Sequence, residues 1–90
     1  MEQIILWETN LEIIRECEKA LHEALKELNL KATVLIYSEH PLIGRNQLWG
    51  RLPVIEIRDL RWSLRPGCAF TAKDLKPLLS HIFFKSKQQE

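Results

Sequence analysis

The sequence predicts an α/β fold in one domain, with a four-stranded mixed sheet and helices packed on its faces. Three observations lead to this prediction. A short apolar run, a long segment of helical apolar spacing and a second apolar run give the order strand, helix, strand. Two further strand-like segments and a capped helix follow. The chain has 90 residues, enough for one core but not for a second domain, so we expect a single domain over residues 1–83.

The first half of the chain predicts a strand, a helix and a second strand. Residues 3–7 form a short apolar run that is typical of a buried strand. Thr9 and Glu12 have the spacing of a capping box, which would begin a helix here. Apolar residues then recur at helical spacing to position 28, and Asn29 suits the left-handed residue that ends a helix. Residues 32–37 are apolar on both alternating sets. We therefore expect an interior strand, parallel to the first and covered on both faces.

The next segment predicts a polar connection and a hairpin. Residues 38–50 are rich in turn formers, with room for a helical turn within 41–49. Residues 53–57 are typical of a third strand, and residues 61–64 alternate like an exposed fourth strand. The turn between the two strands is expected around Arg58-Asp59.

A second helix is predicted near the end of the chain. Thr71 and Asp74 form a capping box, and Phe70 and Leu75 occupy the positions of a hydrophobic staple. An apolar stripe at helical spacing follows, made of Leu75, Leu78, Leu79 and Ile82. Pro77 lies past the first turn and should kink or shorten the helix. Residues 84–90 are expected to be a frayed tail.

Composition excludes several classes of protein. The fractions of 46% hydrophobic and 28% charged residues are those of a globular domain rather than a disordered chain. No apolar run approaches the roughly 20 residues that cross a membrane. The N-terminus carries Glu2 where a signal peptide is basic, and Glu8 interrupts its apolar run. We therefore expect a cytoplasmic protein whose two cysteines are reduced.

Charge is unevenly distributed along the chain. Residues 1–30 contain seven glutamates and three basic residues, a net charge of −4, whereas residues 31–90 have a net charge of +5. Such asymmetry is compatible with an anionic partner, and equally with a solvated acidic helix beside a basic hairpin. Arginines and Trp62 interleave over residues 58–65, as in some single-strand binders. A pI near 7.8 argues against nucleic acid as the partner.

Three segments resemble the thioredoxin- and glutaredoxin-like superfamily. Residues 49–54 (WGRLPV) resemble the segment in which a cis-proline opens the third strand. Gly67-Cys68, before the second capped helix, resembles the glycine turn that precedes the last helix. The end of the first helix is similar to that of small glutaredoxin-like domains. The resemblance covers about residues 3–82 and implies a thioredoxin-like order β-α-β-β-β-α. It also implies a cis bond at Pro53, with the backbone of Leu52 placed against a bound thiol or peptide.

The chain departs from that family at the redox motif. Members carry Cys-x-x-Cys at the start of the first helix, where the helix dipole lowers the thiol pKa. Residues 8–14 contain no cysteine and two carboxylates, so disulfide exchange by the usual route is excluded. Cys17 lies on the apolar stripe and is expected in the core. Cys68 follows a Pro-Gly turn near Arg65. These surroundings favour a thiolate, although Cys68 could equally pack at the end of a strand.

These residues lead to a first hypothesis of a redox-silent binding or adaptor domain without a cofactor. Its groove would take a protein or peptide partner and would be formed by Thr9, Asn10, Trp49, Arg51, Leu52, Pro53, Gly67 and Cys68. The alternative is a monothiol role, in which Cys68 alone forms mixed disulfides, for example with glutathione. A third hypothesis is an oligomer-forming role through Trp62, Phe83 and Phe84. The histidines and cysteines lack metal-ligand spacing.

Overall fold

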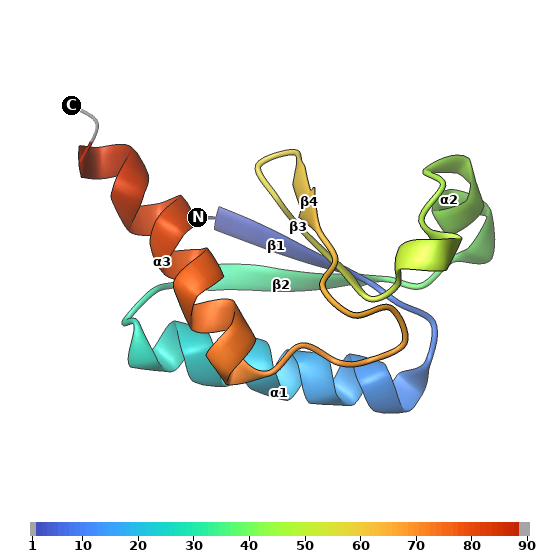
Figure 1. The fold of residues 1–90 in the computed structure, drawn as a ribbon, viewed down its shortest axis with the longest axis horizontal. Helices are drawn as coiled ribbons and strands as arrows, with labels where there is room; N and C mark the ends of the chain where they lie inside the picture. The colour runs from blue at the N-terminus through green and yellow to red at the C-terminus, as the bar shows by residue number, and fades with distance from the viewer. Residues whose placement is uncertain (1, 89–90) are drawn as a thin grey trace.

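The computed structural model describes residues 2–88, with side chains through Phe84, and its elements follow the predicted order (Figure 1). These elements are β1 (Glu2–Trp7), α1 (Leu11–Glu27), β2 (Ala32–Tyr37), α2 (His40–Arg45), the 3-10 helix η1 (Trp49–Arg51), β3 (Val54–Ile57), β4 (Leu60–Trp62) and α3 (Ala72–Gln88). The strand order is β2-β1-β3-β4; β1 and β2 are parallel, and the other neighbours are antiparallel. The predicted α/β class and four-stranded mixed sheet are confirmed, and the arrangement is consistent with a thioredoxin-like one.

Helix α1 begins one residue later than the capping box predicts. The Asn10 side chain, not that of Thr9, accepts hydrogen bonds from the backbone N–H groups of Glu12 (2.9 Å) and Ile13 (3.2 Å). The prediction of a capping box at Thr9 is therefore wrong. The physical reason is that the N–H groups of Thr9 and Asn10 already donate to the carboxylate of Glu8.

Helix α1 ends as predicted, with Asn29 as the left-handed residue that follows it. Asn29 has a φ of 55°, in the left-handed region. Beyond it, the Leu30 N–H donates to the Leu25 carbonyl at 2.9 Å, and the Asn29 N–H donates to the Lys26 carbonyl. This pattern is a Schellman motif, which satisfies carbonyls left open at the helix end.

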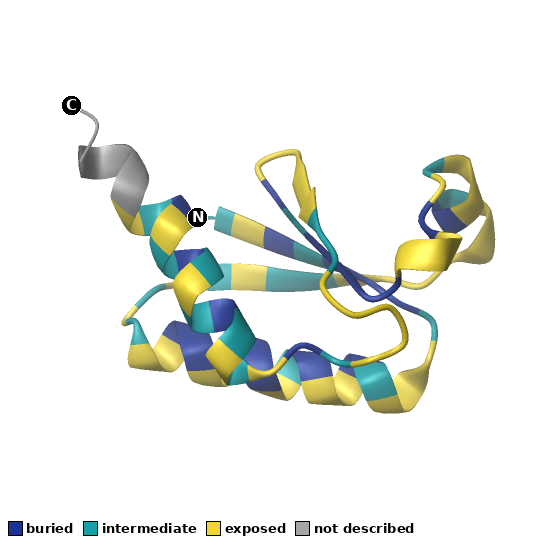
Figure 2. Cartoon of the chain, in the orientation of Figure 1, coloured by how far each residue is buried: buried dark blue, intermediate teal, exposed yellow. Residues whose placement is uncertain are grey.

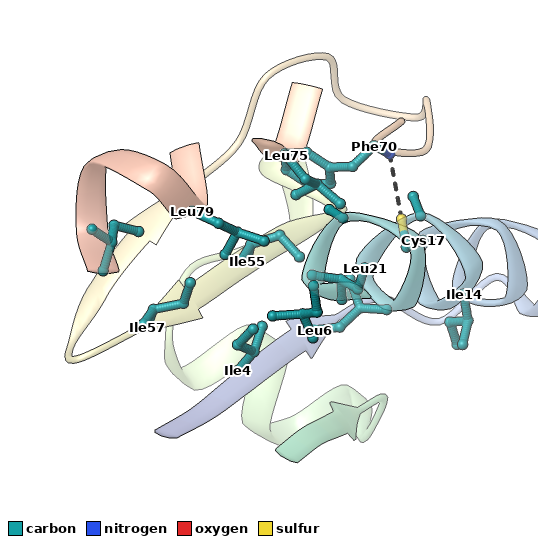
Figure 3. Close-up of a cluster of buried hydrophobic side chains, with 14 residues drawn as sticks. Ile4, Leu6, Ile14, Cys17, Leu21, Ile55, Ile57, Phe70, Leu75 and Leu79 are labelled. Carbon is teal, nitrogen blue, oxygen red and sulfur yellow. Dashed lines mark hydrogen bonds between the residues drawn. The ribbon is translucent and has the colours of Figure 1, made fainter. Parts of the chain in front are cut away.

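The main core lies between one face of the sheet and the helices α1 and α3. Alternation along β1 points Ile4 and Leu6 into this layer, where Leu21 of α1 and Leu79 of α3 contact them within one cluster (Figure 3). All four side chains are fully buried. Figure 2 shows the buried residues of α1 along its inner side. Cys17 is also part of this cluster, as predicted.

A smaller apolar cluster lies on the opposite face of the sheet. It contains Trp7, Ile43, Leu48, Leu52 and Val54. Helix α2, which has six residues, contributes the buried Ile43 and the partly buried Leu42 and packs at one end of β1 and β3. The rest of this face therefore has no helix over it within residues 2–88.

The prediction that residues 32–37 form an interior strand is wrong. β2 is parallel to β1 as predicted, but it is the edge strand of the sheet and has no buried residue (Figure 2). The physical reason is the strand order: β3 pairs with the other side of β1, and no described strand pairs with the outer side of β2. The short α2 covers Trp7 and Val54 and leaves the second face of β2 open, while Ala32 and Val34 pack against the main core.

The hairpin and the last helix follow the predictions with two differences. Arg58 and Asp59 form the turn between β3 and β4, both with positive φ, as a type I′ turn requires. The fourth strand is shorter than expected and ends at Trp62. Pro77 does not shorten α3, which continues to Gln88. The helix therefore extends into the segment for which we expected a frayed tail. Residues 89 and 90 lie outside the described part.

Candidate binding groove beside Pro53

Most segments of the expected groove lie at one end of the long axis of the molecule (Figure 1). The β1–α1 connection carries Thr9 and Asn10, η1 leads into Leu52, and the loop between β4 and α3 carries Gly67. This end is opposite the C-terminal part of α3. The β1–α1 connection comes more than forty positions before Leu52 in the sequence, and Gly67 comes 15 positions after Leu52.

A backbone hydrogen bond joins the two loops that carry Pro53 and Cys68. The peptide bond between Leu52 and Pro53 is cis, as the resemblance implies. The Gly67 N–H donates to the Leu52 carbonyl at 2.8 Å, and the Ser63 hydroxyl donates to the carbonyl of Arg51. Leu52 and Pro53 are buried, whereas Gly67 is exposed. The loops thus form one continuous surface.

Cys68 lies at the end of a tight turn. The Cys68 N–H donates to the Arg65 carbonyl at 2.9 Å, and Gly67 has a φ of 83°. Proline at the second position and glycine with positive φ at the third define a type II turn. This turn leaves Cys68 exposed to solvent, before the chain enters the core at Phe70.

Arg65 is held by the capping box of α3. Asp74 and Thr71 exchange hydrogen bonds as predicted: the Thr71 N–H donates to the Asp74 carboxylate (3.0 Å), and the Asp74 N–H donates to the Thr71 hydroxyl (3.1 Å). Arg65 pairs with the same carboxylate. The Thr71 N–H, followed by the Arg65 guanidinium, lowers the pKa of Asp74. This ion pair fixes the loop that carries Cys68 to the first turn of α3.

The N-terminus of α1 is occupied by the chain's own acceptors. The Glu8 carboxylate is buried and accepts the N–H groups of Thr9 (2.8 Å) and Asn10 (3.0 Å). Asn10 accepts the next two N–H donors, as described above. Four backbone donors that could stabilise a thiolate here are therefore already bonded to side-chain oxygens.

Cys17 is a core residue. Its sulfur is fully buried and accepts a hydrogen bond from the Phe70 N–H at 3.4 Å (Figure 3). Burial raises the pKa of the Cys17 thiol, more than the Phe70 N–H lowers it. The thiol is therefore protonated and shielded from reagents in the folded protein.

Trp49 and Arg51 lie at the outer side of the Pro53 loop. The Trp49 side chain is 48% exposed and packs edge-to-face against His40 of α2, with 5.0 Å between the ring centroids. Trp49 therefore extends the surface from Pro53 toward α2. Arg51 is exposed in η1, directly before Leu52.

The arginines of the hairpin have partners that the sequence did not predict. The Arg61 Nε donates to Glu56 Oε1 at 2.9 Å, and its guanidinium lies 5.6 Å from the centre of the Trp7 ring. Trp7 Nε1 donates to the same Glu56 oxygen at 3.0 Å. Arg58 pairs with Glu2. The alternation of β3, which puts Glu56 on the face of Val54, was the available signal. These pairs account for much of the basic character of the hairpin.

Comparison of the chain with family models, with curated proteins and with solved structures finds no match. Within residues 2–88, no three His, Cys, Asp or Glu side chains are grouped as metal ligands. No helix in the described part is both long and apolar enough to cross a membrane. The residues of the expected groove are therefore interpreted from their geometry alone.

Proposed function

We propose that this chain is a redox-silent, thioredoxin-like binding domain that takes a protein or peptide partner in the groove beside Pro53. The observation that carries the proposal is the hydrogen bond from the Gly67 N–H to the Leu52 carbonyl. It joins two loops into one surface that presents Arg51 and Cys68 to solvent. Leu52 is in extended backbone, with φ −62° and ψ 141°.

An extended partner suits this backbone. A carbonyl oxygen has two lone pairs, and the Gly67 N–H uses one at Leu52. We propose that an N–H of the partner donates to the other. Strand-like pairing with an extended peptide uses backbone groups for affinity and side-chain contacts for selectivity. The exposed guanidinium of Arg51 favours a peptide with an acidic side chain near the paired residue.

The absence of disulfide chemistry is supported by both cysteines. Cys17 is buried, and burial raises the pKa of its thiol. Cys68 has no neighbouring cysteine in the chain, because Cys17 lies in the main core. The start of α1, where the family carries its redox pair, has its N–H donors bonded to Glu8 and Asn10.

The test is selection of peptides from a phage-displayed random library, followed by NMR titration of the best binder into the labelled protein. We expect shifts at Arg51, Leu52 and Gly67. Arg51→Glu should weaken binding about tenfold or more, because it removes a charge-assisted contact and adds repulsion. Arg45→Glu, an exposed arginine in α2, is the matched control and should change affinity less than twofold. Failure to select any binder, or shifts confined to another surface, would contradict the proposal.

A second candidate is a monothiol function of Cys68, which the exposed position of this thiol in the turn bonded to the Leu52 loop favours. In this function the Cys68 thiolate attacks oxidised glutathione, forms the protein–glutathione disulfide and releases one reduced glutathione. The measurement is the rate of this reaction against pH, followed by intact mass. A half-maximal rate well below the ordinary pKa of about 8.5 supports the monothiol function. A rate like that of an unstructured cysteine peptide supports the redox-silent domain.

A further inference from the structure

β2 is an edge strand that lacks the usual protection of edges. Natural proteins prevent unwanted pairing at edge strands by keeping these strands short or by placing charged residues or proline on them. The other edge of this sheet is protected in this way, because β4 has three residues and includes Arg61. β2 has six residues, ATVLIY, with no charge and no proline. Ile36 and Tyr37 are each 36% exposed. Among the described elements, only β1 pairs with β2.

The backbone groups that face outward from β2 are those of Ala32, Val34 and Ile36. The Tyr37 carbonyl accepts the Glu8 N–H, so Tyr37 turns its backbone groups toward β1, in register with Trp7. Backbone groups alternate along a strand. The N–H and carbonyl groups of Val34 and Ile36 therefore point away from β1, toward an open hydrogen-bonding edge.

Two opposite charges flank this edge. Lys31 comes directly before β2, and Glu39 lies two residues after it in extended backbone, with φ −76° and ψ 122°. Both residues are exposed, and neither forms an ion pair with the side chains of residues 2–84. Lys31, Leu35 and Glu39 are separated by four residues each, so they share one face of the strand.

We infer that the β2 edge binds a second copy of this chain by antiparallel pairing about a twofold axis at Leu35. In this register Val34 of each copy is opposite Ile36 of the other, and each such pair exchanges two hydrogen bonds. Lys31 of each copy is opposite Glu39 of the other. No other antiparallel register sets these two charges against each other. The result is one continuous sheet of two copies, closed by its own symmetry.

The β2 edge is separated by β1 from Leu52 and Gly67, which carry the proposed peptide contacts. At its Glu39 end the edge adjoins the outer part of the groove, because the neighbouring His40 packs against Trp49. The charge-reversal experiment below changes no groove residue and measures dimerisation alone, so its failure is distinguishable from failure of the proposed function. Pairing of one short edge buries less surface than a stable complex requires, so we expect a weak dimer with a dissociation constant on the order of micromolar to tens of micromolar.

Charge reversal tests the inference with exposed residues that folding does not need. Sedimentation velocity over a micromolar-to-millimolar series should show a monomer–dimer equilibrium. Lys31→Glu and Glu39→Lys should each weaken dimerisation about tenfold, because each dimer then contains two like-charge pairs. The double variant K31E/E39K should restore the dissociation constant to within about threefold. Lys73→Glu, on α3, is the control and should leave it unchanged. A wild-type protein that is monomeric throughout would overturn the inference, as would a double variant as weak as the single ones.

Cross-linking tests the register directly. In a Cys68→Ser background, Leu35→Cys places two thiols across the axis with Cα atoms about 4.5 Å apart, within disulfide range. Diamide should convert this variant to a covalent dimer. Tyr37→Cys is the control. In the same register the two thiols at position 37 are separated by four residues along the strands, which is about 13 Å. Equal cross-linking of both variants, or of neither, would contradict the register.

Discussion

Burial separates the two cysteines of this chain. Cys17 lies in the main core with its sulfur bonded to the Phe70 N–H, and Cys68 is exposed in a turn. We expect Cys17→Ser to lower the free energy of unfolding by about 1–3 kcal/mol, because it buries a hydroxyl in an apolar cluster. Cys68→Ser should change it by less than about 0.5 kcal/mol. Urea denaturation measures both, and equal small losses would show that Cys17 is not a core residue in solution.

The capping box of α3 makes a pH dependence that can be measured. The pKa of Asp74 in the folded protein lies below its ordinary value of 3.8, because the Thr71 N–H and then Arg65 stabilise the carboxylate. The stability that this carboxylate contributes is therefore present above pH 3.8 and is lost as the pH falls through the lower, folded-state pKa.

The test compares the wild type with Asp74→Asn in urea melts from pH 7 to pH 2. We expect the variant to be less stable near neutral pH by less than about 1 kcal/mol, since the ion pair is largely exposed. The difference should shrink toward zero at the acid end. Asp59→Asn, in the exposed hairpin turn, is the control. A difference that stays constant with pH would contradict the role of the carboxylate.

At the scale of elements, α3 accommodates a residue that disfavours helices. Pro77 is exposed and lies five residues after Ala72, the first residue of α3, yet the helix continues to Gln88. A proline here lacks the N–H that would bond the Lys73 carbonyl. The stripe of Leu75, Leu79 and Ile82, all buried in the main core, outweighs this loss. Tertiary packing therefore decides the length of α3.

Replacement of this proline should stabilise the protein. Pro77→Ala restores the missing hydrogen bond and removes no buried side chain, so we expect the free energy of unfolding to rise by about 1–3 kcal/mol. Thermal and urea denaturation measure the change. Ser80→Ala, one turn further along α3, is the matched control and should give a change of less than about 0.5 kcal/mol. A loss of stability in the proline variant would show that Pro77 fits a bend that the helix requires.

The whole molecule is held by two apolar clusters of unequal size. The main cluster joins α1, α3 and the sheet, whereas the smaller one joins α2 and its flanking loops to Trp7 and Val54. The two clusters share no buried residue, so we expect the smaller one to open without disrupting the main one. The α2 segment is therefore expected to open locally, with a lower free energy than the core.

Two substitutions distinguish these clusters. Leu79→Ala should lower the global free energy of unfolding by about 2–5 kcal/mol, because it opens a cavity in the main core. Ile43→Ala removes an equally buried side chain from the smaller cluster. It should accelerate hydrogen exchange mainly at α2 and η1 amides. Native-state exchange read by NMR tests this, and uniform acceleration across α1 in the Ile43 variant would argue against two independent clusters.

Local patterns in the sequence were sufficient for most of the fold. The apolar spacing of α1, Asn29 at its end, the hairpin turn at Arg58-Asp59 and the capping box at Thr71 were all predicted and are confirmed. Each depends on residues within a turn or two of one another. The physical chemistry of caps, turns and periodicity acts over that range, and a single sequence displays it.

The tertiary structure alone decided which face of each element is covered and which charges are paired. Apolar residues 32–37 predict a strand, but they do not show that β3 pairs with β1 and leaves β2 at the edge, or that α2 is too short to cover the second face of β2. The Glu56 side chain accepts a hydrogen bond from Trp7, which lies 49 positions earlier in the chain. The Leu52 carbonyl accepts a hydrogen bond from the Gly67 N–H of another loop. Such contacts join residues distant in the chain, and their partners are chosen by packing, which no local pattern encodes.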